Sequence, residues 1–236
     1  MSEKTLIGVI VADVDEYGPF VKAACDYNPK EYSLLGKKGI TFDINGATVI
    51  CINCGIGKVN ASAVASALAS LNCTAILNFG LSGGISGASR GGLFVPDKFL
   101  EHDFDLTVLG YKPCEKPNQK YIYEVNKELK EIFELVADTD FGGTAVCGDR
   151  FISSKNDSDF LRDTFSATTC DMETAAIASV CDMADIPFAA LRRISDDAGD
   201  SASESYTEMN NSGELYLPKI FLDILSKVAV LYGGKA

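Results

Sequence analysis

The 236-residue chain has 47% hydrophobic and 23% charged residues, so it has the composition of a globular protein with a sizeable core and not that of a disordered or fibrous one. Its 33 acidic residues outnumber its 21 lysines and arginines, and the net charge of -12 makes nucleic acid and anionic membranes poor partners. The charge favours a small neutral or cationic ligand, and solubility alone is the other explanation for it.

The first part of the chain predicts strands followed by a helix. Residues 6–12 form a continuous apolar run, which is typical of a strand covered on both faces. Residues 31–53 look like a strand and hairpin group, with Asn45-Gly46 as a strong turn signal. Residues 59–71 have helical periodicity, and the expected buried face consists of Val59, Ala63, Val64, Ala67, Leu68 and Leu71.

The remainder of the chain alternates between strand and helix patterns. Residues 75–79 predict a strand that runs into the glycine-rich residues 80–84. Further strands are predicted at 98–108, 144–147, 167–170 and 188–194, and helices at 125–137, 174–184 and 218–231. Because no repeat or linker interrupts this alternation, we expect one α/β domain over residues 1–236. The order of the strands is not readable from the sequence.

The eight cysteines indicate a reducing compartment. Several lie in strand-like runs, and no secretory signal is visible, because the apolar segment at residues 5–12 is short and acidic residues follow it. We therefore expect reduced, packed thiols in the cytoplasm. Cys51-x-x-Cys54 has the spacing of a redox or zinc pair, but no second pair accompanies it and His102 is the sole histidine, so we expect no metal site.

Polar side chains concentrate where the predicted strands end, which is where α/β sheets bind ligands. Asp13, Asp15 and Glu16 follow the first strand, and residues 80–84, 148–151 and 192–197 follow others. The segment Asp171-Met172-Glu173 lies just before a predicted helix. Acidic residues at that place are also favoured by the helix dipole, so helix capping is the alternative explanation for both carboxylates.

Taken together, these motifs resemble the 5′-methylthioadenosine/S-adenosylhomocysteine nucleosidases of the nucleoside phosphorylase superfamily. The resemblance runs in family order from about residue 5 to about residue 200. It is carried by residues 7–10 (IGVI) leading to Glu16, 55–61 (GIGKVNA), 78–84 (NFGLSGG), 102–105 (HDFD), 110–111 (GY), 148–152 (GDRFI), 171–178 (DMETAAIA) and 192–196 (RRISD). It implies a three-layer domain with a central mixed β-sheet flanked by helices.

The resemblance also implies a role for each site residue. Asp196 would be the acid that protonates N7 of the purine, and Glu16 the carboxylate that activates the attacking water. Glu173 would accept hydrogen bonds from the ribose 2′- and 3′-hydroxyls. Phe151 would stack on the purine, the Ile152 backbone would recognise the edge of the purine, and Ser195 would hold the loop that carries the acid Asp196. Asp13, Leu81, Ser82, Leu109 and Met172 complete the implied substrate site, which needs no cofactor.

Four departures from the family pattern concern the substrate. Asp13 stands where these nucleosidases commonly have Met, Leu81 where Ser or Thr is usual, and Asp171 where Glu is usual. Leu109 matches a Phe of the alkylthio pocket that a neighbouring subunit supplies in the family, which implies a homodimer. The alternative is that Leu109 is an ordinary core residue of its own chain. Asp13 would suit a more polar 5′ group.

Three other functions remain open, namely a nucleoside phosphorylase, a nucleosidase of altered purine nucleoside specificity and a non-catalytic module. Phosphorolysis needs cationic donors, but the first loop offers carboxylates and Phe79 precedes Gly80 with no arginine adjacent, so hydrolysis is favoured. Arg90 is the arginine that would have to reach inward. A non-catalytic purine-binding module is the third alternative, and the presence of Glu16, Glu173 and Asp196 together argues against it.

Overall fold

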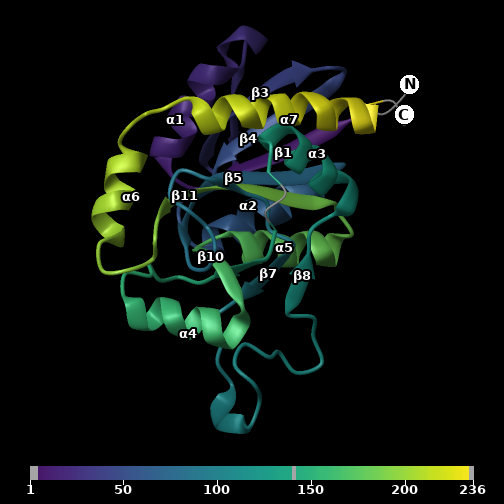
Figure 1. Ribbon diagram of the computed structural model, residues 1–236. Helices are drawn as coiled ribbons and strands as arrows, with labels where there is room; N and C mark the ends of the chain where they lie inside the picture. Colours follow the sequence, from purple (N-terminus) through teal and green to yellow (C-terminus); the bar gives the residue numbers. More distant parts are fainter. Residues whose placement is uncertain (1–4, 140–141, 234–236) are drawn as a thin grey trace.

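A mixed β-sheet runs through the centre of the protein in the computed structural model, which describes residues 5–139 and 142–233 (Figure 1). Strand β1 (Leu6–Val11) lies between β4 (Ala47–Asn53) and β5 (Ala75–Gly84) and runs parallel to both. Strand β11 (Phe188–Asp196) runs parallel along nearly the whole of β5. The carboxyl ends of β1, β5 and β11 therefore meet at one edge of the sheet.

Shorter strands extend the sheet on both sides. On one side, β3 (Lys37–Ile44) and β2 (Lys30–Leu34) follow β4 in antiparallel order. On the other side, β10 (Ala167–Asp171), β9 (Thr144–Cys147), β7 (Lys98–Glu101) and β8 (Ile122–Glu124) follow the end of β5, and β6 (Leu93–Phe94) pairs with β11. The predicted turn between β3 and β4 is confirmed, because Asn45 and Gly46 both adopt positive φ (46° and 85°), as a tight hairpin requires.

Helices cover both faces of the sheet and complete the expected three-layer α/β architecture. Helices α1 (Val14–Ala23), α3 (Lys127–Ala137) and α7 (Tyr216–Gly233) pack on one face, and α2 (Lys58–Ser70) and α5 (Thr174–Ala184) on the other (Figure 1). Helix α4 (Lys155–Phe165) packs against β9 and β10, and α6 (Ala202–Asn210) against β11. Two 3₁₀ turns, η1 (Ala24–Tyr27) and η2 (Thr107–Leu109), complete the elements. Among the described helices, none is both long and apolar enough to cross a membrane.

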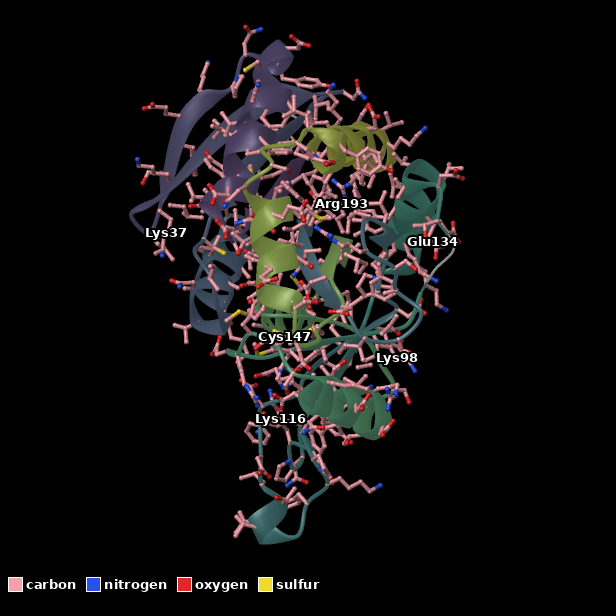
Figure 2. All side chains as sticks on the ribbon, turned by 60° about the vertical axis from the view of Figure 1, so that its left-hand side comes forward. Lys37, Lys98, Lys116, Glu134, Cys147 and Arg193 are labelled. Carbon is pink, nitrogen blue, oxygen red and sulfur yellow. The ribbon has the colours of Figure 1, made fainter. Side chains whose placement is uncertain are left out.

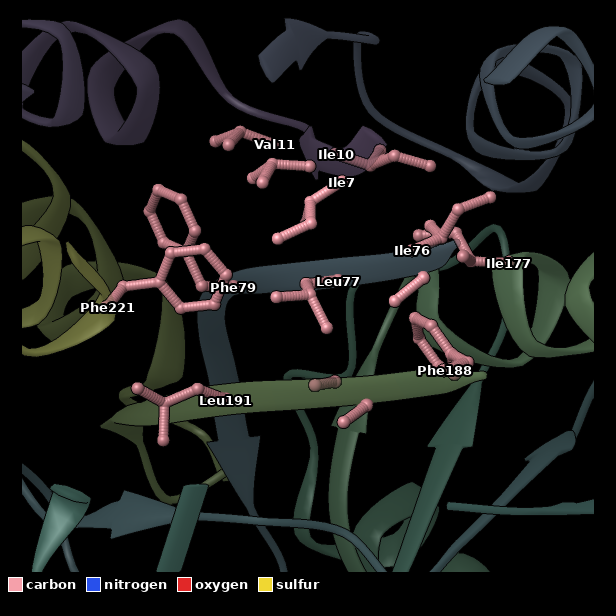
Figure 3. Packing of buried hydrophobic residues seen from close by; sticks show 14 of the residues in the cluster. Ile7, Ile10, Val11, Ile76, Leu77, Phe79, Ile177, Phe188, Leu191 and Phe221 are labelled. Carbon is pink, nitrogen blue, oxygen red and sulfur yellow. The ribbon is translucent and has the colours of Figure 1, made fainter. Parts of the chain in front are cut away.

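An aromatic cluster anchors the central strands beneath the edge where β1, β5 and β11 end. The rings of Phe79 and Phe221 lie 4.5 Å apart, and Phe20 lies 5.2 Å from Phe79. Figure 3 shows Phe79 and Phe221 in contact beside Leu77, Ile7 and Leu191. Phe79 is 1% exposed and directly precedes Gly80. Its packing therefore fixes the position of the backbone where the glycine-rich end of β5 begins.

Several local predictions were wrong. The strand expected over 98–108 ends at Glu101, and its last residues form η2. The expected inner face of α2 includes Val59 and Leu71, but these are 80% and 39% exposed, while Ala61 and Ala65 are buried instead. Helices α1, α4 and α6 were not predicted, because polar residues interrupt their short apolar patterns.

Candidate active site

A cavity of about 330 Å³ opens at the edge where β1, β5 and β11 end. Every residue predicted for catalysis or substrate binding lines it except Leu109. The predicted residues present are Asp13, Glu16, Leu81, Ser82, Phe151, Ile152, Met172, Glu173, Ser195 and Asp196. The structure adds Ala12, Ile56, Gly83, Arg150, Cys170, Asp171 and Tyr206. Segments far apart in the sequence therefore meet at one concave site.

Glu16 reaches the cavity from the first turn of α1. Asp13 and Glu16 form a capping box, in which the Asp13 side chain accepts from the Glu16 N–H and Glu16 Oε2 accepts from the Asp13 N–H (3.4 Å). Asp13 Oδ1 also accepts from the Asp15 N–H (2.9 Å). Glu16 Oε1 accepts a 2.6 Å hydrogen bond from the Leu81 N–H. Burial raises the pKa of the Glu16 carboxyl from 4.5 to about 7, although the Leu81 N–H and the Arg192 guanidinium oppose the rise. Glu16 is thus held near the pKa that suits a general base at neutral pH.

Arg192 is a buried cation that the sequence prediction did not place among these carboxylates. It is 2% exposed, and its Nη2 lies 3.3 Å from Asp171 Oδ2 and 3.7 Å from Glu173 Oε2. Gly80 makes room for it, because a Cβ there would lie 2.5 Å from Arg192 Nη1 and 3.0 Å from Glu16 Oε1. Position 80 therefore requires glycine, because the Arg192 and Glu16 side chains approach the backbone closely there.

Arg193 points away from the carboxylates. It pairs with Glu214, and its guanidinium carbon lies 5.0 Å from the centre of the Tyr216 ring; Figure 2 labels Arg193. Arg192, in contrast, faces Asp171 and Glu173. Alternation along β11 explains the difference, because successive side chains point to opposite faces.

The capping explanation is right for Asp171 and wrong for Glu173. Asp171 accepts hydrogen bonds from the Glu173 N–H (2.9 Å), the Thr174 N–H (2.8 Å) and the Thr174 hydroxyl (2.6 Å), so it caps α5. Glu173 Oε1 instead accepts from the Gly57 N–H at 2.9 Å. Burial raises the pKa of the Glu173 carboxyl from 4.5 to about 7, with Arg192 lowering it in part. Its second oxygen, Oε2, lies 3.7 Å from Arg192 Nη2, and the Glu173 side chain lines the cavity.

Asp196 sits at the end of β11 in a site that accommodates its neutral form. Its Oδ1 accepts from the Ala198 N–H at 2.8 Å, and its Oδ2 lies 2.6 Å from Ser195 Oγ. Ser195 Oγ also lies 3.2 Å from the Ser82 carbonyl. A serine hydroxyl carries one hydrogen, so a protonated Asp196 can donate to Ser195 while Ser195 donates to Ser82. Burial raises the pKa of the Asp196 carboxyl, against the opposing effect of the bonds from Ser195 and Ala198.

An apolar slot with one free hydroxyl lies beside Asp196. Phe151 is 40% exposed and meets the ring of Tyr206 edge-on at 5.5 Å, while Ile152 is buried. Ser82 Oγ is buried and has no hydrogen-bond partner within the described part of the chain. Tyr206 was missed by sequence reasoning because it comes from α6, the short helix that was not predicted. The slot can take a flat heterocycle and offers it a polar contact.

Leu109 lies outside the cavity, on an arm formed by residues 102–121. The arm extends away from the body of the protein between β7 and β8, with Lys116 near its root (Figures 1 and 2). Leu109 is 68% exposed and Val108 is 91% exposed, so Leu109 is not a core residue of its own chain. Its predicted contact with substrate is therefore not made within one chain.

The arginines near the cavity are occupied by other groups. Arg90 Nε donates to the Ser195 carbonyl (3.0 Å) and Arg90 Nη2 to Glu208 (2.6 Å), so Arg90 braces the acid loop and does not line the cavity. Arg150 lines the cavity but pairs with Asp157. The site thus presents mainly carboxylates to a ligand.

Comparisons with known proteins concern the family and the fold of the chain. Residues 6–226 match the family model described as the phosphorylase superfamily. A 5′-methylthioadenosine/S-adenosylhomocysteine nucleosidase of Halalkalibacterium halodurans is 31% identical over 231 residues, which make up 95% of this chain and 99% of that protein. The crystal structure of the Helicobacter pylori nucleosidase with butyl-thio-DADMe-Immucillin-A has a TM-score of 0.89 at 23% identity and covers 95% of this chain and 99% of its own. The S-adenosylhomocysteine nucleosidase of Streptococcus pyogenes, in complex with 5-methylthiotubericidin, has a TM-score of 0.86 at 26% identity, with 97% and 98% covered.

Proposed function

This chain belongs to the phosphorylase superfamily, and within it to the 5′-methylthioadenosine/S-adenosylhomocysteine nucleosidases, and on that premise we propose that its cavity hydrolyses the N-glycosidic bond of these purine nucleosides. The observation that carries the proposal is that Glu16, Glu173 and Asp196, from three distant segments, line one cavity beside Phe151. Their chemistry matches what this bond requires, since one carboxyl must donate a proton while others stabilise positive charge.

Asp196 protonates the leaving group in this proposal. As the bond to the purine lengthens, negative charge builds up on the base, and a proton at N7 neutralises it. The raised pKa of Asp196 and its chain of contacts through Ser195 to Ser82 support a neutral acid in the free enzyme. Phe151 and the free Ser82 hydroxyl are placed to hold the purine.

Glu173 and Glu16 act on the sugar. The Glu173 carboxylate accepts hydrogen bonds from the ribose 2′- and 3′-hydroxyls, and its charge favours the oxocarbenium-like sugar. Glu16 takes a proton from the water that attacks C1′. Arg192 pairs with Asp171 and Glu173. Its positive charge orients these two carboxylates and reduces the repulsion between them.

Water is favoured over phosphate as the nucleophile. Asp13, Asp15 and Glu16 surround the end of β1, and a phosphate dianion there would meet like charges. Arg90 and Arg150 are committed to Glu208 and Asp157. These contacts leave no cationic cradle of the kind that phosphorolysis needs among the described residues of the cavity.

Product analysis tests the reaction. Incubation with methylthioadenosine or S-adenosylhomocysteine should give free adenine and the free thioribose product, at a rate that inorganic phosphate does not change. Chromatography of the products, with and without phosphate, makes the measurement. A sugar 1-phosphate would identify a phosphorylase, and unchanged nucleoside a non-catalytic binding module.

We also propose that two copies of this chain form a homodimer through the arm. Val108, Leu109 and Tyr111 on the arm are exposed apolar side chains, and so are Ile56 and Val59 at the start of α2. Ile56 lines the cavity, so a partner's arm seated here would close the substrate site from outside. Residues 107–113 of the arm are all exposed in one chain.

Leu109→Asp should weaken both association and substrate affinity by at least about tenfold, because a charge would enter the apolar contact. Sedimentation velocity and KM measure the two effects. Leu135→Asp on α3 is the matched control, since Leu135 is 74% exposed and far along the chain from the arm. A fully active wild-type monomer would contradict the proposed dimer.

The cytoplasm is the location we propose for the enzyme. All eight cysteines are free, and only Cys25 is exposed. Burial raises the pKa of most of the others, which keeps them as unreactive thiols and suits a reducing compartment.

A further inference from the structure

Two sequence motifs, GIGKVNA (residues 55–61) and HDFD (residues 102–105), contact each other outside the cavity. Lys58 begins α2, and its Nζ lies 2.5 Å from Asp103 Oδ1 and 3.1 Å from Glu101 Oε2. None of these three residues lines the cavity. A cation in the first turn of a helix opposes the helix dipole, so the two carboxylates are what makes this position favourable for a lysine.

Asp149 closes a polar triangle with Lys58 and Asp103. The Asp149 N–H donates to Asp103 Oδ2 (2.9 Å), and the Lys58 N–H donates to Asp149 Oδ1 (2.8 Å). The polar triangle thus joins the start of α2, the root of the arm and the loop between β9 and α4. The loop also lies close to the arm root, because a Cβ at Gly148 would overlap the imidazole of His102.

Lys58 is the cation on which Asp103 depends. A second lysine, Lys116 near the root of the arm, pairs with Glu101 (Figure 2). Among the ion pairs of the described residues, Asp103 pairs with Lys58 alone. Removal of the Lys58 ammonium would therefore leave Glu101 paired, but Asp103 would lie without a cation beside another carboxylate and would turn toward water. The Asp149 N–H would then lose its acceptor.

The polar triangle adjoins the part of the site that would bind the purine. Asp149 directly precedes residues 150–152, which all line the cavity and include Phe151. This segment forms neither helix nor strand, so the sheet does not fix its position directly. Asp149 ties it to two other segments, and the position of Phe151 depends on those contacts.

The backbone of Lys58 adjoins the part of the site that would bind the sugar. Gly57 directly precedes Lys58, and the Gly57 N–H donates to Glu173 Oε1 at 2.9 Å. A change of the Lys58 side chain leaves both backbone N–H groups in place. Such a change should therefore affect the Phe151 segment more than it affects Glu173.

We propose that Lys58 is a positioning residue of this enzyme. Its ammonium group holds Asp103, and Asp103 holds the Asp149 backbone. Phe151 is thereby kept where it can stack on the purine. The inference rests on the proposed function, in which Phe151 binds the base. Loss of the Lys58 charge lowers purine affinity while the carboxylates that perform the chemistry keep their places.

Lys58→Met keeps the length of the side chain and removes its charge. On methylthioadenosine, KM should rise roughly five- to tenfold while kcat stays within about threefold of wild type, because a lost charge-assisted hydrogen bond costs binding free energy of this order. Titration with adenine should show the same rise in Kd. A role in stability alone would give the opposite pattern, since partial unfolding lowers the measured kcat through loss of active enzyme and leaves KM unchanged.

Further variants test the path through Asp103. Lys58→Arg should keep KM within about threefold of wild type, because a guanidinium can pair with both carboxylates. Asp103→Asn should raise KM as Lys58→Met does, because an amide has one acceptor oxygen where two donors now bind two. The double variant should lie within about threefold of the worse single variant, because both changes release the same N–H. Lys130→Met is the matched control, since Lys130 on α3 also pairs with two carboxylates, Asp97 and Glu134, and lies outside the cavity.

Thermal melts identify any variant that does not fold, and the more exposed Asp103 then carries the test. The inference is overturned, with the proposed function left standing, by an unchanged KM in a folded Lys58→Met or Asp103→Asn variant, by an equal rise in Lys130→Met, by equal rises in Lys58→Arg and Lys58→Met, or by a loss confined to kcat. A wild-type enzyme that releases no adenine from methylthioadenosine or S-adenosylhomocysteine overturns the proposed function and this inference with it.

Discussion

Asp196→Asn should lower kcat on adenine nucleosides by about 100-fold or more, the usual loss when a general acid is removed. Asparagine can still accept the Ala198 N–H that now binds Oδ1 and can contact Ser195, so the loop after β11 should keep its shape. It has no acidic proton for N7. Substrate affinity should change far less than kcat, and steady-state kinetics measures both.

The choice of leaving group makes this result diagnostic. A riboside whose leaving group needs no protonation, such as 4-nitrophenol, should lose much less activity in the variant than an adenine nucleoside does. Asp197→Asn at the exposed neighbouring residue is the control, and its kcat should stay within about threefold of wild type. Equal losses on both kinds of substrate, or none, would remove Asp196 from the role of proton donor.

Glu16→Gln should abolish most turnover and leave the fold and adenine binding intact. The amide keeps an oxygen that can accept the Leu81 N–H, but it cannot take a proton from water. Single-turnover kinetics and adenine titration measure the two properties. Near-normal turnover in the variant would exclude Glu16 as the base and make Asp13 or Asp15 the next candidate.

The pKa of Glu16 adds two pH effects to this prediction. Because the base must be ionised, wild-type kcat/KM should fall as the pH drops through about 7, and not only near 4.5. The raised pKa also means that the folded protein binds this proton more tightly than the unfolded chain does, so the free energy of unfolding falls as pH rises from about 4.5 to about 7. Thermal melts of Glu16→Gln should show a smaller loss of stability between pH 5 and pH 8 than those of wild type.

The local elements of the fold were largely predictable because each depends on neighbours in sequence. The apolar run of β1 and the Asn45-Gly46 turn occur where the pattern indicated, and α3 lies within the predicted range 125–137. The prediction failed where packing was needed to decide. Residues 102–108 alternate like a strand but leave the sheet, and Val59 has helical spacing but points to solvent. In both places the conformation depends on contacts with another segment of the protein. For the arm, we propose that these contacts are made with another subunit.

The same distinction between local patterns and long-range contacts applies to the active site. Strand-end motifs are short and contiguous, so they were sufficient to predict an α/β protein of the nucleosidase family with carboxylates at its strand ends. Three features of the site required the folded protein: Asp171 caps α5 while Glu173 faces the cavity, Arg192 occupies the space left by Gly80, and Tyr206 binds Asp13. Each of these depends on where side chains from distant segments point once the strands are ordered, and the strand order is set by packing of the whole sheet rather than by any local pattern.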